Sequence, residues 1–146
     1  MKQDRISNYH IARTLGVGVS GEVVLGTNCH TNERVAIKYF YNEHDVEVEV
    51  QAYRSFPPCS NILQMIEYDM SPEDGTNPYI VLELANQDLF SFIENRKRVS
   101  KSLVNHLSKG ILNGLKTMHT AGIAHCDIKL DNLFLDQDLN LSLIHI

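Results

Sequence analysis

The sequence predicts an α+β fold in which a small antiparallel sheet comes first and helices follow. Short apolar segments typical of strands alternate with turn signals in the first half of the chain, at 17–25, 35–40, 62–68 and 80–84. The second half instead carries apolar residues at helical spacing. The change falls near Leu84 to Asp88, so we expect two lobes, 1–84 and 85–146, joined by a short connector.

Composition and charge narrow the class of protein. The 146 residues are 43% hydrophobic with a formal net charge of −5, which is ordinary for a globular domain and argues against a nucleic-acid surface. The longest apolar stretches are too short for a membrane span, and no secretory signal is visible. Three scattered cysteines give no disulfide framework or zinc site, so we expect an intracellular, cytoplasmic location. The oligomeric state is left open.

The segment 43–56 fits two secondary structures. Val46, Val48 and Val50 recur at period two, as in a strand. Val46, Val50 and Tyr53 also recur at helical spacing. Periodicity alone leaves the choice open.

The second half predicts a short helix within 88–95 and a long helix over 102–121. An apolar stripe runs along the long helix, formed by Leu103, Leu107, Ile111, Leu115 and Met118. Ser100 is placed to cap its start, and Gly122 suits the position after its end.

A glycine motif lies near the N-terminus, with Gly16, Gly18 and Gly21 spaced as Gly-x-Gly-x-x-Gly. Glycine lets backbone amides approach phosphate oxygens closely, but such triplets also mark bulged hairpins. A dinucleotide fold requires a helix after the third glycine, whereas β-forming residues 23–25 follow here. The motif therefore predicts a flap between two strands.

Lys38 ends the apolar segment Val35-Ala36-Ile37, seventeen residues after Gly21. A lysine at a strand end is commonly a surface cation. One hairpin return, however, would place this ammonium beneath the flap, where it would need an anionic partner if buried. Glu49 is the first candidate for that partner and Glu47 the second.

The segment 123–135 follows the long helix and carries polar residues at suggestive spacing. Asp127 is suited to accept a hydroxyl proton, and Lys129 to neutralise a phosphoryl group. Asn132 offers an amide oxygen, a donor that Mg²⁺ accepts.

Taken in order, the glycine flap, the Val-Ala-Ile-Lys strand and the His-x-Asp-x-Lys-x-x-Asn loop resemble a eukaryotic-type protein kinase domain from about Tyr9 to Asn140. Lys129, two residues after Asp127, corresponds to the Ser/Thr form. The resemblance implies a two-lobe fold, with an N-lobe of antiparallel sheet plus one helix and an incomplete helical C-lobe. It implies ATP and Mg²⁺ as cofactors and a protein substrate with a Ser or Thr acceptor. From the charge and the short apolar stretches, we expect no nucleic-acid or membrane partner.

The resemblance also implies residue roles. Catalytic roles fall to Asp127 as base, Lys129 at the γ-phosphoryl group, and Lys38 paired with Glu49. Asn132 would bind Mg²⁺. The nucleotide would be bound by Leu15, Gly16, Gly18, Gly21, Val23, Ala36, Lys38, Glu83, Ala85, Asp88 and Phe134, with Leu82 at the back of the pocket and Asp131 near substrate or ribose. For Asp88 and Asp131, plain solvent exposure is an equal alternative. The family's register after its helix glutamate fits Tyr53, Phe56 and Asn61-Ile62, which favours Glu49 and a helix over 43–56.

The chain departs from the family at several places. The spacing from Lys38 to Glu49 is short, and Cys126 replaces the arginine that receives an activation-loop phosphate. His145 stands where the family's Asp-Phe-Gly aspartate binds metal. The last six residues, 141–146, match the translated end of a transposon adapter used in sequencing libraries, so we expect a non-native tail on a truncated chain. A native strand is the alternative.

These departures leave two functions. The first is a Ser/Thr protein kinase, present as a fragment that we expect to be inactive alone. The second is a pseudokinase or truncated nucleotide-binding regulatory protein without catalysis. A phosphotransferase for small molecules or lipids on a related fold fits the Lys38 and Lys129 motifs less well.

Overall fold

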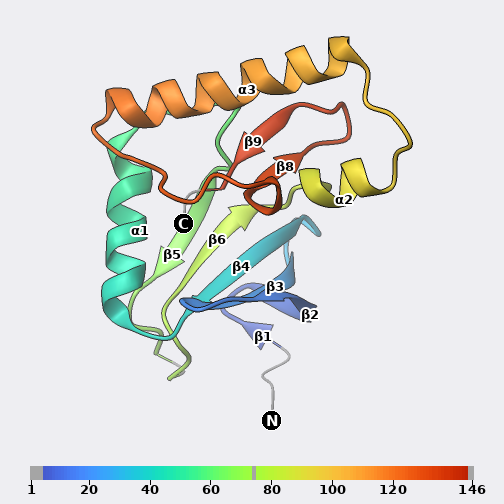
Figure 1. The fold of residues 1–146 in the computed structure, drawn as a ribbon. Coiled ribbons are helices and arrows are strands. Elements are labelled where there is room, and N and C mark those ends of the chain that lie inside the picture. The colour runs from blue at the N-terminus through green and yellow to red at the C-terminus, as the bar shows by residue number, and fades with distance from the viewer. Residues whose placement is uncertain (1–4, 74, 145–146) are drawn as a thin grey trace. The chain divides into compact units, whose positions relative to one another are not determined.

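The computed structural model describes residues 5–73 and 75–144. The chain divides into two compact units (Figure 1). Unit 1 comprises residues up to 51 together with 65–84, and unit 2 comprises 52–64 together with the residues from 85 onward.

Unit 1 is built on a six-stranded sheet in the order β1-β2-β3-β4-β6-β5, in which every neighbouring pair is antiparallel. The strands are β1 Arg5–Ile6, β2 Tyr9–Val17, β3 Gly21–Asn28, β4 Arg34–Phe40, β5 Met65–Asp69 and β6 Tyr79–Glu83. The predicted antiparallel sheet in the first half of the chain is thereby confirmed.

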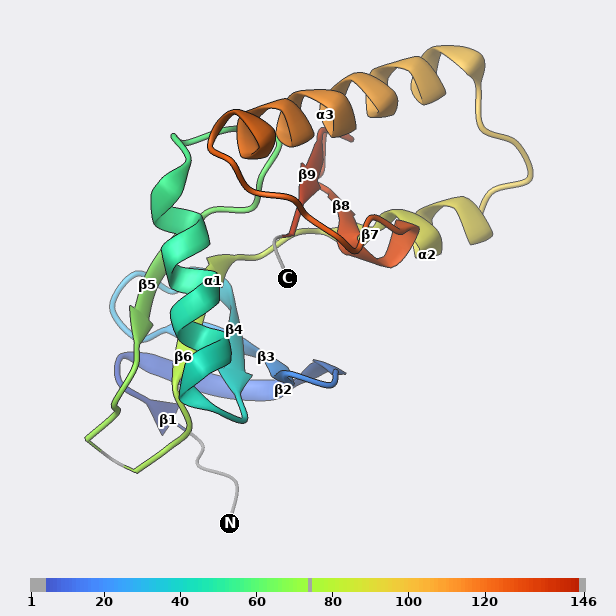
Figure 2. The same cartoon turned by 60° about the vertical axis from the view of Figure 1, so that its left-hand side comes forward.

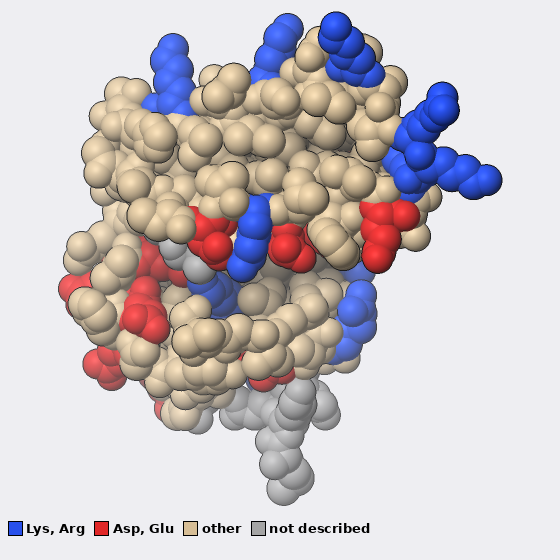
Figure 3. Space-filling view, in the orientation of Figure 1, with Lys and Arg blue, Asp and Glu red and all other residues tan. Residues whose placement is uncertain are grey.

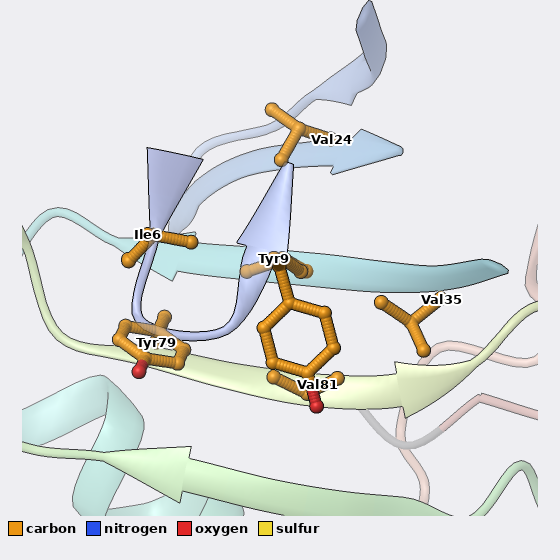
Figure 4. Close-up of a cluster of buried hydrophobic side chains, with 7 residues drawn as sticks. Ile6, Tyr9, Val24, Val35, Tyr79 and Val81 are labelled. Carbon is orange, nitrogen blue, oxygen red and sulfur yellow. The ribbon is translucent and has the colours of Figure 1, made fainter. Parts of the chain in front are cut away.

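One face of this sheet carries a compact apolar core. Ile6, Tyr9, Val24, Val35, Ile37, Tyr79 and Val81 are all buried and come from five strands (Figure 4). Because side chains alternate between the two faces of a strand, Val35 and Ile37 in β4 reach this core together. Burial of these β-branched and aromatic residues fixes the register that positions the residues of the flap and of β4.

The segment that periodicity left open is the helix α1, Glu43–Ser55. Val46 and Val50 are buried, whereas Val48 is 51% exposed, as helical spacing requires and strand alternation forbids. The side chain of Asn42 accepts a hydrogen bond from the backbone N–H of Asp45 and so caps the helix start. Residues 43–51 of α1 belong to unit 1, where the helix runs along the sheet (Figures 1 and 2).

Unit 2 combines helices with a small sheet in the order β7-β8-β9. Its elements after the connector are β7 Gln87–Asp88, α2 Leu89–Glu94, α3 Lys101–Thr120, the 3₁₀ turn η1 Leu130–Asn132, β8 Leu133–Leu135 and β9 Leu141–Leu143 (Figure 2). The Ser100 hydroxyl accepts from the backbone N–H of Leu103, and Gly122 takes φ +76° just after the helix, as expected for both caps. Within the described residues, no helix is long and apolar enough to cross a membrane.

Two glycines, Gly110 and Gly114, let α3 approach its neighbours in unit 2 closely. A Cβ at Gly114 would lie 2.4 Å from Leu143 Cδ1 and 2.7 Å from the backbone oxygen of Asn61. The Asn61 amide donates to the carbonyl oxygen of Leu141 at 2.6 Å, and the amide of Asn113 donates to Asn61 at 2.8 Å. Close packing therefore joins helix α3, strand β9 and the segment that follows α1.

The strand β9 carries the first residues of the expected tail. Leu141 and Leu143 are 1% and 0% exposed, and β9 pairs with β8. That 141–146 is non-native stays a prediction, and His145 lies outside the described residues.

Basic side chains of unit 2 are spread along its surface. On the face drawn in Figure 3, the blue side chains in the region of α3 stand apart, with neutral surface between them. No continuous basic stripe follows the helix on this face.

Candidate active site

The glycine motif forms the tip of the hairpin between β2 and β3. The backbone N–H of Gly18 donates to the carbonyl of Gly21 at 2.8 Å, and Val19 at the tip is fully exposed. A Cβ at Gly21 would lie 1.7 Å from the carbonyl oxygen of Tyr39 on β4, so only glycine fits between the strands there. The expected flap between two strands is present, without a helix after the third glycine.

A polar contact that sequence reasoning missed joins the two strands of this flap. The Thr14 hydroxyl donates to the Glu22 carboxylate at 2.5 Å. Both residues lie close to the tip, on β2 and β3 respectively. A cross-strand pair of this kind stiffens the hairpin near its tip.

Lys38 and Glu49 form a buried ion pair in unit 1. Lys38 Nζ lies 2.5 Å from Glu49 Oε2, and the two side chains are 7% and 5% exposed. The other candidate, Glu47, is exposed and accepts a hydrogen bond from Gln51 instead. The short spacing does not prevent the pair, because α1 begins at Glu43 and turns Glu49 toward β4.

Burial shapes the electrostatics of this pair. Removal from water raises the pKa of Glu49 above its ordinary value, and this effect outweighs the attraction of Lys38, which lowers the pKa. The second carboxylate oxygen, Oε1, has no hydrogen-bond partner among residues 5–73 and 75–144. The ring of Phe40 lies 4.7 Å from Lys38 Nζ, a contact that the sequence reasoning also missed.

Most of the residues expected to surround an adenine ring occupy four neighbouring strands of unit 1, β2, β3, β4 and β6. Val23 and Ala36 are half-buried on β3 and β4, while Leu15 on β2 is 38% exposed. Leu82 on β6 is buried and lies opposite Ala36 in the sheet, and Glu83 ends that strand. Their contact with a nucleotide stays a prediction.

The second group of predicted residues comes together in the loop before β8 in unit 2. Lys129 Nζ lies 3.1 Å from Asp127 Oδ2. The Asn132 amide donates to the Asp127 backbone oxygen at 2.9 Å and to Oδ2 at 2.8 Å. The hydrogen bond from Lys129 above all, and that from Asn132, hold the pKa of Asp127 below its ordinary value, so this exposed carboxylate is ionised at neutral pH.

His125 supports this loop from inside. Its Nδ1 accepts from the backbone N–H of Asp127 at 3.2 Å, and its Nε2 lies 2.5 Å from the carbonyl oxygen of Ile144. A nitrogen that accepts carries no proton, so the geometry assigns the neutral imidazole proton to Nε2, which donates to Ile144. Cys126, the departure from the family, is exposed and takes φ +63°.

Two further predicted residues meet in the small sheet. Asp88 pairs with Phe134 across β7 and β8. Both carboxylate oxygens of Asp88 already accept from Ser91, one from its N–H and one from its hydroxyl, each at 2.7 Å. These bonds cap α2 and lower the pKa of Asp88, although burial alone would raise it.

Asp131 is exposed, and Ala85 is the first residue of unit 2 after the connector.

The donor set of the loop fits a metal ion only in part. Both Asn132 amide N–H groups point to Asp127, which leaves its oxygen as the atom suited to a hard cation. Among the described residues, no group of three or more His, Cys, Asp or Glu side chains is arranged to hold a metal. That Asn132 binds Mg²⁺ stays a prediction.

Comparison with known proteins agrees with these geometries. The protein kinase domain family matches residues 9–145. The chain is 31% identical over 149 residues to the probable serine/threonine-protein kinase MARK-B of Dictyostelium discoideum, covering 97% of this chain and 20% of that protein. It is 30% identical over 143 residues to the mitogen-activated protein kinase mpkA of Aspergillus fumigatus, covering 92% and 34% respectively.

A third relative, the probable serine/threonine-protein kinase MARK-C of Dictyostelium discoideum, is 28% identical over 142 residues, with 91% of this chain and 18% of the relative covered. The chain thus spans between about a fifth and a third of the length of these three relatives. Most of this chain matches one family, in agreement with its curled antiparallel sheet and its buried Lys38–Glu49 pair. The chain belongs to the protein kinase domain family.

Proposed function

We propose that the protein is an ATP- and Mg²⁺-dependent kinase that transfers the γ-phosphoryl group of ATP to Ser or Thr hydroxyls of protein substrates. The observation that carries this proposal is the loop geometry of unit 2, in which one ionised carboxylate, Asp127, is held by both Lys129 and Asn132. A hydrogen-bond acceptor (Asp127), a cation (Lys129) and an amide oxygen (Asn132) thus lie within six residues of the sequence. Together these groups are suited to position a hydroxyl beside a phosphoryl group.

In the proposed reaction, the substrate hydroxyl oxygen bonds to the γ-phosphorus as the bond from that phosphorus to the β–γ bridging oxygen breaks. The hydroxyl proton passes to Asp127, and ADP leaves with the electron pair of the broken bond. Asp127 has a lowered pKa, so it orients the hydroxyl as an ionised acceptor before it takes the proton. Mg²⁺ would neutralise phosphate charge, with Asn132 as one of its ligands.

Most of the residues that would bind the nucleotide belong to unit 1. The glycine flap would cover the phosphates with its backbone, and Lys38, oriented by Glu49, would contact phosphate oxygens. Leu15, Val23, Ala36 and Phe134 would contact adenine. Glu83 and Ala85 would offer backbone hydrogen bonds to it.

The 146-residue chain alone is expected to bind nucleotide without turnover. In the family an aspartate follows the strand that corresponds to β9, whereas the sequence here has His145 at that position. Neutral imidazole is a poor ligand for Mg²⁺ beside a carboxylate. The same observation favours the second candidate function, a nucleotide-binding protein of kinase fold without catalysis.

Sequencing the source transcript beyond the codon of Asn140 separates these two functions. An Asp-Phe-Gly sequence followed by a further helical region would support the kinase and identify 141–146 as non-native. If the Leu-Ser-Leu-Ile-His-Ile codons lead directly to a stop, the non-catalytic function takes precedence.

A transfer assay then tests the proposed activity directly. The protein encoded by the complete transcript is incubated with Mg²⁺, γ-labelled ATP and peptide pools that carry only Ser, Thr or Tyr as acceptor. We expect label in the Ser and Thr pools, and its loss in Asp127→Asn with ATP affinity retained. Label in the Tyr pool alone, or an Asp127→Asn variant with full activity, would refute the proposal.

A further inference from the structure

Phe40 lies at the end of β4, two residues after Lys38, and no motif marks it. Side chains two apart on a strand point to the same face, so the ring and the ammonium face the same region of unit 1. Phe40 is 1% exposed and Lys38 is 6% exposed. The distance of 4.7 Å from Nζ to the ring centroid lies within the range of a cation–π contact.

Lys38 needs this second contact because its carboxylate partner is itself poorly solvated. Burial raises the pKa of Glu49, and Glu49 Oε1 lacks a hydrogen-bond partner among the described residues. A buried ion pair gains little net stability unless other groups compensate for the loss of water. An aromatic face attracts the ammonium without accepting one of its hydrogen bonds, so it leaves N–H groups available for a ligand.

Backbone contacts hold Phe40 rigidly in this place. Its N–H donates to the carbonyl of Pro78 at 2.8 Å, and its Cα lies opposite Gly21 in the β3–β4 register. A Cβ at Gly21 would come within 3.3 Å of Phe40 Cα. The third glycine of the flap therefore packs directly on the residue whose ring faces Lys38.

We propose that Phe40 is a positioning residue for Lys38: its ring stabilises the cationic ammonium and directs it, together with Glu49, toward the phosphates of a bound nucleotide. This inference rests on the proposed nucleotide binding, and it adds a residue whose aromatic character sets the strength of that binding. The proposed effect depends on the electrostatic potential of the ring face. A residue that only packs in the core would not show this dependence.

The test replaces Phe40 in the 146-residue chain by phenylalanines with one, three and five ring fluorines. Fluorination withdraws charge from the ring face with little change of shape, so packing stays nearly constant while the attraction of the ammonium falls. Mg·ATP affinity is measured for each, with a thermal melt to verify folding. We expect affinity to fall stepwise, by about tenfold for five fluorines, which corresponds to about 1.4 kcal/mol.

A second readout does not depend on nucleotide. Labelling of Lys38 by acetic anhydride at one fixed pH, followed by mass spectrometry, reports how much of the amine is neutral and reactive. We expect faster labelling at Lys38 with each added fluorine. Fluorination of Phe92, a buried ring that faces Arg96 in unit 2, serves as the matched control and should leave both ATP affinity and Lys38 labelling unchanged.

The outcomes separate this inference from the proposed function. If labelling follows fluorination but no variant, including the unsubstituted chain, binds Mg·ATP, the action of Phe40 on Lys38 stands and nucleotide binding fails. If the chain binds Mg·ATP and neither readout follows fluorination, Phe40 is a core residue only and the inference is overturned. Phe40→Leu with unchanged affinity and labelling would overturn it as well.

Discussion

The two units each hold a lysine–carboxylate pair, and the pairs differ in almost every physical respect. Lys38 and Glu49 lie on separate elements, their side chains are 7% and 5% exposed, and Nζ lies 2.5 Å from Oε2. Lys129 and Asp127 lie two residues apart in one loop, are 53% and 46% exposed, and are 3.1 Å apart. Burial raises the pKa of Glu49, whereas hydrogen bonds lower that of Asp127.

The difference teaches that one type of ion pair serves two purposes in this fold. The pair of unit 1 is part of the core, so its geometry and the stability of the unit depend on each other. The pair of unit 2 is screened by water and contributes little to folding, so its residues are available for the chemistry proposed above. The predictions below test this contrast, beginning with the largest expected effect.

Lys38→Met should cause the largest loss of stability. It leaves Glu49 buried without its cation, and loss of one partner of a buried pair costs about 3–5 kcal/mol. Urea unfolding of the chain measures the effect. The double variant Lys38→Met/Glu49→Leu should recover most of the stability without recovering Mg·ATP binding. A single variant as stable as the original chain would contradict the assignment of this pair to the core.

Gly21→Ala should be the next most disruptive change, and it acts in unit 1. The added Cβ would lie 1.7 Å from the backbone oxygen of Tyr39, so β3 and β4 must separate, and we expect a loss of about 2 kcal/mol or more. Gly16→Ala is the matched control, because no atom lies within 4 Å of its Cβ position. Equal stabilities of the two variants would show that the strands are not as close as described.

Gly114→Ala makes the corresponding test in unit 2. The nearest atom to the added Cβ belongs to the flexible side chain of Leu143 at 2.4 Å, followed by the backbone oxygen of Asn61 at 2.7 Å. Because the leucine can move and the backbone oxygen cannot easily do so, we expect a loss of about 1–2 kcal/mol. Thermal melting should rank it between the alanine variants of Gly16 and Gly21.

The two carboxylates should give opposite pH dependence of stability. Glu49 has a raised pKa in the folded state, so the native chain binds more protons than the unfolded one, and stability falls as pH rises above about 4.3, the ordinary Glu value. Asp127 has a lowered pKa, so its contribution is present above about pH 3.9 and is lost as pH falls through its folded value.

Denaturant unfolding against pH measures both effects. Between about pH 4.5 and 7, the stability difference between the original chain and Glu49→Gln should shrink or reverse as pH rises, whereas the difference from Asp127→Asn should stay flat. If the stability differences of the two variants change with pH in the same way, the two ion pairs do not differ electrostatically as described.

Arg96→Ala should have the smallest effect. The Arg96 guanidinium lies 4.0 Å from the Phe92 ring centroid in unit 2, but Arg96 is exposed, so we expect a loss of about 0.5–1 kcal/mol. Urea unfolding measures the loss, and a loss of about 2 kcal/mol or more would show that exposure does not weaken this contact.

Much of the fold could be predicted because the signals are local. Helix α3 has an apolar stripe, a serine cap and a terminal glycine, and each signal lies within a few residues of the structure it specifies. The order of glycine flap, lysine strand and Asp127 loop could likewise be predicted from spacing in the sequence. Asp127, Lys129 and Asn132 meet because they are neighbours in one loop.

Other features could not be predicted because they depend on side-chain conformations and contacts that spacing in the sequence does not specify. His125 is held by Ile144 and by a backbone group, and Phe40 acquires significance only through the conformation of Lys38. For Asp88, the family resemblance implied a ribose contact, which stays a prediction, and the structure adds that its carboxylate caps a helix by bonding to Ser91. No spacing rule separates these uses of the same side chain.

By itself, then, the sequence determined that a sheet precedes helices, where α3 begins and ends, and which loop residues form the Asp127 cluster. Only the tertiary structure determined which side chains of α1 are buried in unit 1. Its valines fit a strand and a helix equally, and the family register favoured the helix. Burial of Val46 and Val50 turns Glu49 rather than Glu47 toward Lys38. The physical reason is that periodicity tells which residues share a face, whereas the partner of that face is set by packing between distant segments.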